Sequence, residues 1–337
     1  MRVQAPAKIN LHLRVGPIRA DGFHPIVSWM STIGLFDILE IDRSHGRFTF
    51  SCDSPAVPPD ASNLVVKAVA ALADSVAKGS SAGLIASLNS SHHLTEKEVG
   101  GEARDLDGEP RNREGGAMTD FCLKVALHKR IPVGAGLGGG SSDGAFTLLA
   151  LNHLWNLHWP RRRLMEIAKT IGSDVPFFLN GPSAIVRGRG EEVESIEQPG
   201  ERPAGKWVPI IFWPKPMPTP LVYRMFDELR LGKESNLSPQ PPWNLWLKLA
   251  SADLLPLLVN DLETAAFAID AQLGQVRSEL ESLLRRPVRM SGSGSSLFSL
   301  YDQRPEAEAA ARLVTKRYKL PVLPVELAPA MPDSLNE

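Results

Sequence analysis

The chain has little cysteine, no excess of charge of either sign and no long hydrophobic run. Its two cysteines, Cys52 and Cys122, are far apart and lack the spacing of metal ligands. Two small buried thiols in a reducing cytoplasm therefore fit better than a disulfide framework. The first residues lack the apolar core of a signal peptide, and no run approaches the ~20 apolar residues of a membrane span. We expect a soluble, cytoplasmic protein with no membrane partner.

The charge balance also restricts the partners. The 37 Lys and Arg residues nearly match the 38 Asp and Glu residues, which gives a formal net charge of -1. A protein that binds nucleic acid through many phosphates needs a basic excess, so we expect no nucleic-acid partner. With 337 residues, 43% of them hydrophobic, the chain can bury substantial cores. We expect two domains, 1–198 and 199–327, with the boundary where proline, glycine and charge accumulate near 196–205.

Apolar periodicity predicts a mixture of strands and helices. The predicted strands cover residues 2–15, 33–41, 48–52, 121–128, 207–212, 297–301 and 322–327. Residues 184–192, with Gly188 and Gly190, are expected to form a strand and a turn. The predicted helices include residues 63–78, 145–155, 161–171 and 305–318. Between residues 96 and 116 the chain mixes Glu, Asp, Arg and Gly with almost nothing apolar. Such a segment cannot offset the entropy of ordering, so we expect a disordered insertion within 79–118.

Glycine is concentrated in one stretch, residues 132–143, immediately before an apolar helical pattern at Leu148, Leu151 and Trp155. Such a loop can turn several backbone N–H groups toward one point, and the helix adds its unpaired amides and the positive end of its dipole. The stretch therefore predicts a phosphate-binding loop. Its candidate residues are Pro132, Val133, Gly134, Ala135, Gly136, Leu137, Gly138, Gly139, Gly140, Ser141 and Ser142.

Three other interpretations of this loop fit less well. A flexible linker would normally be followed by polar chain rather than by an apolar helix. A dinucleotide-binding fingerprint needs an acidic residue ~20 positions further on, where this chain has a run of arginines at 161–163. The P-loop signature needs a lysine before its serine, but Gly140 precedes Ser141. The positive charge for a phosphate must therefore come from elsewhere in the chain.

The first predicted strand offers such a charge. Lys8 and Asn10 are two residues apart, so their side chains should project from the same face of the strand. A lone strand lysine is more often a solvated charge at a sheet edge. Lys8 can be interpreted as a site residue only if other motifs of the chain support that role.

Four ordered motifs together resemble those of the GHMP kinases, the superfamily of galactokinase, homoserine kinase and mevalonate kinase. They are Pro6-Ala7-Lys8-Ile9-Asn10-Leu11, the glycine loop, Gly172-Ser173-Asp174-Val175-Pro176 and Ser291-Gly292-Ser293-Gly294-Ser295-Ser296. The match is closer to one branch, whose substrate is a small alcohol with a cytidine diphosphate group. The stretch Arg19-Ala20-Asp21-Gly22-Phe23-His24 and the triple-glycine loop carry that closer match. The resemblance covers most of the chain except roughly residues 79–118.

The resemblance implies an α+β fold. Its N-terminal domain would be like the second domain of ribosomal protein S5, and a ferredoxin-like GHMP kinase C-terminal domain would follow, with substrate between them. The implied reaction moves the γ-phosphoryl group of ATP to a hydroxyl group, with Asp174 as the base and Lys8 as its partner. Magnesium is expected with ATP, but the sequence shows no carboxylate cluster that we can assign to it. We expect a monomer or a weak homodimer.

The resemblance also implies binding residues. Asn63 and Lys129 would lie near the adenine, whereas the substrate would contact Asn10, Phe23, His24, Thr219 and Tyr223. Phe23 and His24 would hold the cytosine, with Tyr223 as the second plate of a sandwich. Tyrosine is commoner in the family at the position of Phe23, which keeps the stacking face and loses a hydroxyl.

Plainer interpretations remain open for several of these residues. Asn63 and Asp174 could simply cap helices, His24 could be an ordinary turn residue, and Tyr223 could pack on the core. Two other functions are also open. A different GHMP small-molecule kinase, of the homoserine or mevalonate type, would not need the aromatic residues and His24. A non-catalytic binding module on the same fold would be expected to have lost Lys8 or Asp174.

Overall fold

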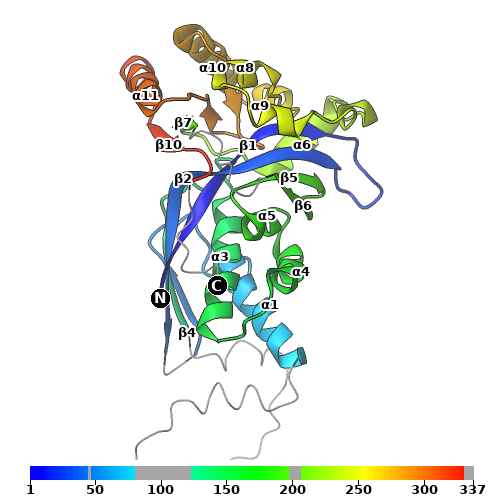
Figure 1. Ribbon diagram of the computed structural model, residues 1–337, viewed down its shortest axis with the longest axis vertical. Coiled ribbons are helices and arrows are strands. Elements are labelled where there is room, and N and C mark those ends of the chain that lie inside the picture. The colour runs from blue at the N-terminus through cyan, green and yellow to red at the C-terminus, as the bar shows by residue number, and fades with distance from the viewer. Residues whose placement is uncertain (45–46, 80–122, 197–205, 330–337) are drawn as a thin grey trace, which may run out of the picture.

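The computed structural model describes residues 1–44, 47–79, 123–196 and 206–329. Figure 1 shows a tall first part, in which long strands are covered on one side by helices, and a second part built onto one end of it. Residues 80–118 of the predicted insertion, residues 197–205 at the predicted domain boundary and Cys122 lie outside the described residues. No helix in the described ranges is long and apolar enough to cross a membrane.

The first part is built on a six-stranded sheet in the order β3-β4-β2-β5-β6, with β1 also paired to β2. Its strands are β1 (Arg2–Val15), β2 (Ile26–Arg43), β3 (Thr49–Cys52), β4 (Leu123–His128), β5 (Ser183–Gly188) and β6 (Glu192–Ser195). Strand β1 pairs antiparallel with β2, and Lys8 lies opposite Thr32. The register shifts between Asn10 and His12. Strand β2 begins earlier than its predicted start because its first half is buried between β1 and β5.

Four helices of the first part are described: α1 (Leu64–Gly79), α3 (Gly139–Leu154), α4 (Arg161–Ile171) and α5 (Val175–Asn180). The helix predicted after the glycine loop is present, and Leu148 and Leu151 on it are buried. It begins within the glycines, at Gly139. The sequence did not predict α5, because six residues are too few to show a helical period.

The second part has a four-stranded sheet in the order β10-β7-β9-β8, with all three pairings antiparallel. Its strands are β7 (Trp207–Ile211), β8 (Arg289–Met290), β9 (Leu297–Phe298) and β10 (Val322–Glu326). Its α-helices are α6 (Thr219–Glu228), α7 (Trp243–Trp246), α8 (Ser251–Leu254), α9 (Glu263–Ile269), α10 (Ala271–Leu284) and α11 (Arg304–Tyr318). Two 3-10 turns, η1 (Glu234–Asn236) and η2 (Leu255–Leu257), lie between them.

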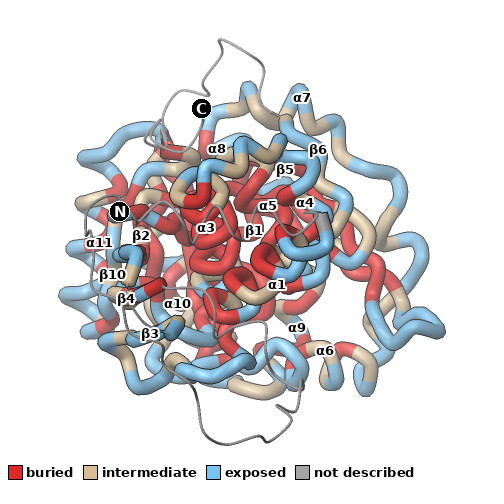
Figure 2. The backbone as a smooth tube through the Cα atoms, turned by 90° about the horizontal axis from the view of Figure 1, so that it is seen from below, coloured by how far each residue is buried: buried red, intermediate tan, exposed pale blue. Residues whose placement is uncertain are grey.

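Backbone hydrogen bonds fix the second part to the first sheet. The N–H of Leu13 in β1 donates to the carbonyl of Val259 (2.8 Å), and the N–H of Asp261 donates to the carbonyl of Leu13 (3.0 Å). Figure 2 shows the buried segments concentrated along the middle of the molecule, around α3 and β1. Strand β1 is therefore shared, and side chains from both parts can meet beside it.

Candidate active site

A cavity of about 430 Å³ is lined by residues of both parts. Strand β1 contributes Lys8 and Asn10, α6 contributes Thr219 and Tyr223, and the turn before α5 contributes Asp174. Residues 132–141 of the glycine loop form much of the wall. The fold thus brings together segments that are more than two hundred positions apart in the sequence.

Three carbonyl groups of the glycine loop accept hydrogen bonds from the second part. The carbonyl of Gly134 accepts from the N–H of Met217 (3.0 Å), and that of Ala135 accepts from the N–H of Ser296 (3.1 Å). The carbonyl of Gly136 accepts from the Ser291 hydroxyl (2.9 Å). Within the described ranges, no N–H of residues 134–138 donates to another residue. These amides, with the N-terminus of α3 beside them, remain available to an anion.

Three glycines make this geometry accessible. Gly134, Gly136 and Gly138 have φ values of 71°, 75° and 69°, in the left-handed region that other residues avoid. At Gly136 there is also no room for a side chain, since an added Cβ would lie 2.2 Å from the carbonyl oxygen of Ser291. The loop therefore needs glycine both for its conformation and for its close packing against the second part.

Lys8 lies at the centre of the site and its side chain is buried (5% exposed). Its Nζ donates to Asn10 Oδ1 (2.6 Å) and to the carbonyl of Gly136 (3.1 Å). A carboxylate oxygen of Asp174 lies 3.6 Å from the same Nζ. Lys8 is therefore a cation fixed between the glycine loop and a carboxylate, rather than a solvated edge charge.

Asp174 occupies the position just before α5, where a capping residue would stand. Its side chain makes no capping hydrogen bond, and it lines the cavity instead. Its ion pair with Lys8 gives the carboxylate an orientation that capping would not require. The geometry thus favours a site residue over a helix cap.

Asn10 holds Lys8 in place. While its Oδ1 accepts from Lys8, its Nδ2 donates to the hydroxyl of Ser28 (2.8 Å). That hydroxyl in turn donates to the carbonyl of His12 (2.9 Å). The amide side chain of Asn10 is therefore oriented from both ends.

Asn63 caps a helix and also lines the cavity. Its Oδ1 accepts from the N–H of Val65 (2.8 Å) at the start of α1, which is a capping contact. Its Nδ2 donates to the carbonyl of Pro58 (2.8 Å), and the residue lines the cavity. Capping and lining are compatible here because the cap holds the loop that forms this wall.

Lys129 lies between two buried carboxylates that sequence reasoning did not assign to the site. Its Nζ donates to Asp37 and to Asp143 (2.9 Å). Burial alone would lower the pKa of Lys129, but the charges of Asp143 and Asp37 outweigh it and raise that pKa. Burial raises the pKa of Asp143 to about 7, against the opposing effect of Lys129. Asp143 ends the glycine stretch and could have been noticed, whereas Asp37 stands in a strand without any motif.

One member of the predicted loop, Ser142, does not line the cavity. It is buried in the first turn of α3, and its hydroxyl has no hydrogen-bond partner among the described residues. The oxygen Oδ1 of Asp143 is likewise buried without a partner in that part of the chain.

The residues predicted to contact cytosine differ in burial and in their neighbours. The ring of His24 is buried and lies 5.1 Å from the ring of Tyr223, and its Nδ1 donates to the carbonyl of Gly16 (2.9 Å). Phe23 is 48% exposed and does not line the cavity, and its ring is covered by the guanidinium of Arg189 at 4.9 Å. Neither His24 nor Phe23 lines the cavity. The structure packs the His24 ring against Tyr223, which does line it, and leaves Phe23 exposed.

Tyr223 and Thr219 form the α6 side of the cavity. Burial, helped by the charge of Asp174, raises the pKa of Tyr223, so its phenol stays neutral. The hydroxyl of Thr219 lies 2.9 Å from that of Ser293, whose turn also lines the cavity. This side therefore presents an aromatic face and neutral hydroxyls.

Comparison with known proteins shows the family to which the chain belongs. Residues 110–182 match the family described as the GHMP kinases N terminal domain. A protein of Prochlorococcus marinus named 4-diphosphocytidyl-2-C-methyl-D-erythritol kinase is 34% identical over 92% of this chain and 87% of its own length. The chain belongs to this kinase family. A Cupriavidus metallidurans protein of the same name is 31% identical over 90% of this chain and 85% of its own.

Solved structures show the same relationship. The crystal structure of a 4-(cytidine 5'-diphospho)-2C-methyl-D-erythritol kinase is 28% identical, with a TM-score of 0.71 over 98% of this chain and 100% of that one. The homoserine kinase of Cytophaga hutchinsonii, at 15% identity and a TM-score of 0.62, shares the fold. The predicted resemblance to the GHMP kinases is confirmed, and so is a mixed α and β architecture. The chain is an ATP-dependent small-molecule kinase of this family.

Proposed function

We propose that this kinase transfers the γ-phosphoryl group of ATP to the 2-hydroxyl of 4-diphosphocytidyl-2-C-methyl-D-erythritol, in the non-mevalonate isoprenoid pathway. The observation that carries the proposal is the position of Lys8. Its Nζ lies 3.1 Å from the Gly136 carbonyl of the phosphate loop and 3.6 Å from the Asp174 carboxylate. A hydroxyl group beside Asp174 would therefore face a phosphoryl group held by the loop.

The residues then divide the work of phosphoryl transfer. Asp174 accepts the proton of the attacking hydroxyl, while the new O–P bond forms and the bond from the γ-phosphorus to the bridging oxygen of ADP breaks. Lys8 orients Asp174 and offsets negative charge on the transferring group. Residues 134–141 hold the phosphates through their backbone, and the ADP oxygen takes the leaving electron pair.

The nucleotide base would lie at the wall formed by Asn63 and Lys129. Both line the cavity next to the apolar side chains of Val57 and Leu64. Magnesium usually accompanies ATP and is held largely by phosphates and water. Among the described residues, no group of three or more His, Cys, Asp or Glu could hold a metal by itself. No step of the proposal depends on a protein ligand to magnesium.

The cytidine diphosphate end would lie toward α6. We assign the cytosine contact to Tyr223, backed by His24, and polar contacts to Asn10 and Thr219. Phe23 contributes less in this proposal, because its ring lies outside the cavity under Arg189.

We further propose the domain limits 1–198 and 199–327, with a first domain like the second domain of ribosomal protein S5. The strand order β10-β7-β9-β8 supports a ferredoxin-like second domain. Numbered along the chain within this domain, the strands lie in the order 4-1-3-2 across the sheet. Helices α6 to α10 and then α11 occupy the two crossovers of such a β-α-β-β-α-β unit. The proposed enzyme works in the cytoplasm as a monomer or weak homodimer.

A coupled ADP-release assay tests the proposed substrate. ATP is offered with the cytidyl alcohol, with homoserine and with mevalonate, each at several concentrations. Turnover with the cytidyl alcohol alone supports the proposal. Faster turnover with homoserine or mevalonate would favour another GHMP kinase, and no turnover with any alcohol would favour a binding module.

A further inference from the structure

A turn at residues 291–294 supports the glycine loop from the side of the second part. The hydroxyl of Ser291 donates to the carbonyl of Gly136 (2.9 Å) and accepts from the N–H of Asn10 (3.2 Å). The carbonyl of Gly136 is also the one that receives Lys8. The position of Ser291 therefore sets the position of the backbone on which the Lys8 ammonium rests.

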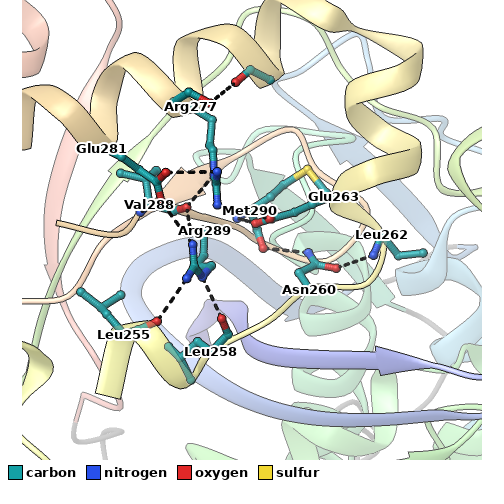
Figure 3. Close-up of polar contacts among 12 residues, drawn as sticks. Leu255, Leu258, Asn260, Leu262, Glu263, Arg277, Glu281, Val288, Arg289 and Met290 are labelled. Atoms are coloured by element: carbon teal, nitrogen blue, oxygen red, sulfur yellow. Dashed lines mark hydrogen bonds and ion pairs between the residues drawn. The ribbon is translucent and has the colours of Figure 1, made fainter. Parts of the chain in front are cut away.

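Asn260 fixes this turn by a pair of hydrogen bonds. Its Nδ2 donates to the carbonyl of Met290 and to the carbonyl of Gly292, both at 2.8 Å. Its Oδ1 accepts from the N–H of Leu262 (3.0 Å). Figure 3 shows Asn260 reaching from the segment before α9 toward the strand that carries Met290. The two carbonyl groups that flank Ser291 are thus held by one buried side chain.

The segment that carries Asn260 is itself anchored to the first sheet. Asn260 forms a parallel bridge with Leu13 of β1. The carboxylate of Asp261 accepts from the guanidinium of Arg14 (2.9 Å) and from the N–H of Val15 (2.9 Å). Asn260 therefore fixes the position of the turn relative to β1, the strand that also carries Lys8.

Charged side chains hold the strand before the turn from its other side (Figure 3). Glu263 accepts from the N–H of Met290 (2.8 Å), and Glu281 accepts from the N–H of Val288 (3.0 Å). Arg277 donates to the carbonyl of Val288 (3.0 Å) and pairs with Glu281 (3.1 Å). Strand β8 is therefore fixed by these side chains as well. In the turn after it, Asn260 holds the Gly292 carbonyl, while the Thr219 hydroxyl contacts Ser293 and the Ser291 N–H donates to the Ser296 carbonyl.

We propose that Asn260 is a positioning residue for phosphoryl transfer. It holds the 291–294 turn so that Ser291 supports the Gly136 carbonyl against which Lys8 is placed. Asn260 does not line the cavity, and it acts on the reaction through Ser291. The inference deepens the proposed function and rests on it for the identity of the reaction.

The substitution Asn260→Asp tests this role with little change in shape. Aspartate keeps the oxygen that accepts from Leu262, but it places a second oxygen against two carbonyl groups and removes both donated bonds. A misplacement of about 1 Å at a reacting site can cost ~100-fold in rate. We expect kcat to fall by roughly 10- to 100-fold, while KM for ATP stays within about threefold because the loop amides remain.

Asn236→Asp is the matched control. Asn236 also donates from its Nδ2 to two carbonyl groups, those of Val15 (2.9 Å) and Leu231 (3.2 Å), and it lies outside the cavity. This variant should lose similar stability in a thermal melt and keep kcat within about twofold. If Asn236→Asp lowers kcat as much as Asn260→Asp, the effect is general destabilisation and the inference is wrong.

Ser291→Ala completes the test. If Asn260 acts through Ser291, the double variant should lose little more kcat than the worse single variant. Losses that multiply, or a kcat within twofold of wild type in Asn260→Asp, would overturn the inference. Asn260→Ser, with one neutral donor, replaces the aspartate variant in the same cycle if that variant does not fold. An inactive wild type would instead overturn the proposed function, so the two failures are distinguishable.

Discussion

The two ends of the cavity are built from different materials. At the glycine-loop end the wall is backbone. Three of its glycines have positive φ, the carbonyls of Gly134 and Gly136 accept from the second part, and amides are left for the ligand. Where the two bases are proposed to bind, the wall consists of side chains. Asn63 and Lys129 line the part proposed for adenine, and Tyr223 lines the part proposed for cytosine. A backbone wall is sensitive to substitution where its glycines have positive φ and pack tightly, whereas a side-chain wall can be altered one contact at a time. The predictions below test this contrast, beginning with the chemistry at the backbone end.

The largest effect is expected from Asp174→Asn, which keeps the shape of the side chain and removes its charge and basicity. A positioned general base contributes roughly 10² to 10⁴ in rate, so turnover should fall by that factor while ATP affinity changes little. Single-turnover kinetics and a thermal melt on the same preparation measure the two effects. A helix cap would instead cost ~0.5 to 2 kcal/mol of stability and leave the folded fraction fully active.

Lys8→Met sharpens the same prediction. The Lys8 ammonium lies 3.6 Å from the Asp174 carboxylate, so the two should act as one unit. The double variant should therefore be only slightly slower than the worse single variant. Rate losses that multiply would show that the residues contribute separately.

Gly136→Ala should disrupt the backbone end. Alanine at a φ of 75° costs roughly 1 to 2 kcal/mol, and its Cβ would collide with the Ser291 carbonyl at 2.2 Å. We expect a loss of at least ~2 kcal/mol in the free energy of unfolding, measured by urea titration without ligand. Gly140→Ala is the matched control, because its Cβ would meet nothing nearer than Leu64 at 3.9 Å. Equal losses in the two variants would contradict a loop built around tight glycine packing.

Asp143 should leave a signature in the pH dependence of stability. Its pKa is raised by burial from 3.8 to about 7 in the folded protein, so the folded state keeps a proton that the unfolded state releases. Its contribution to stability is therefore largest near pH 4 and declines as pH rises toward 7, by up to about 1.4 kcal/mol per pH unit. The difference in unfolding free energy between wild type and Asp143→Asn should follow this decline. Asp74→Asn, at an exposed carboxylate on α1, is the control for the removal of one negative charge.

The smallest effect is expected from Phe23→Ala. A base stacked on an aromatic ring is worth about 1 to 3 kcal/mol, but Phe23 lies outside the cavity under Arg189. Affinity for the cytidyl substrate should therefore fall by less than about threefold, a loss below ~1 kcal/mol. A loss above tenfold would return Phe23 to the cytosine site.

The same contrast explains what could be predicted from the sequence. The glycine loop is a local pattern with a direct conformational meaning, so Gly136 could be predicted as part of it before the fold was known. Lys8 could be predicted as a site residue only through the resemblance of its motif to that of the GHMP kinases. Asp37 and Asn260 are not part of any motif that we identified in the sequence. Only the tertiary structure brings Asp37 to Lys129 and Asn260 to the 291–294 turn. The contact between Phe23 and Arg189 likewise joins residues far apart in the chain, which no local pattern relates to one another.

The most direct test of the contrast is a crossed binding experiment. ATP and the cytidyl substrate are titrated separately by calorimetry into wild type, Gly136→Ala and Tyr223→Ala. Gly136→Ala should weaken ATP by at least tenfold and leave the cytidyl substrate within about threefold, a loss below ~1 kcal/mol. Tyr223→Ala should weaken the cytidyl substrate by the ~1 to 3 kcal/mol of a stacked base and leave ATP unchanged. If either variant weakens both ligands by the same factor, the two ends do not work separately and the account is wrong.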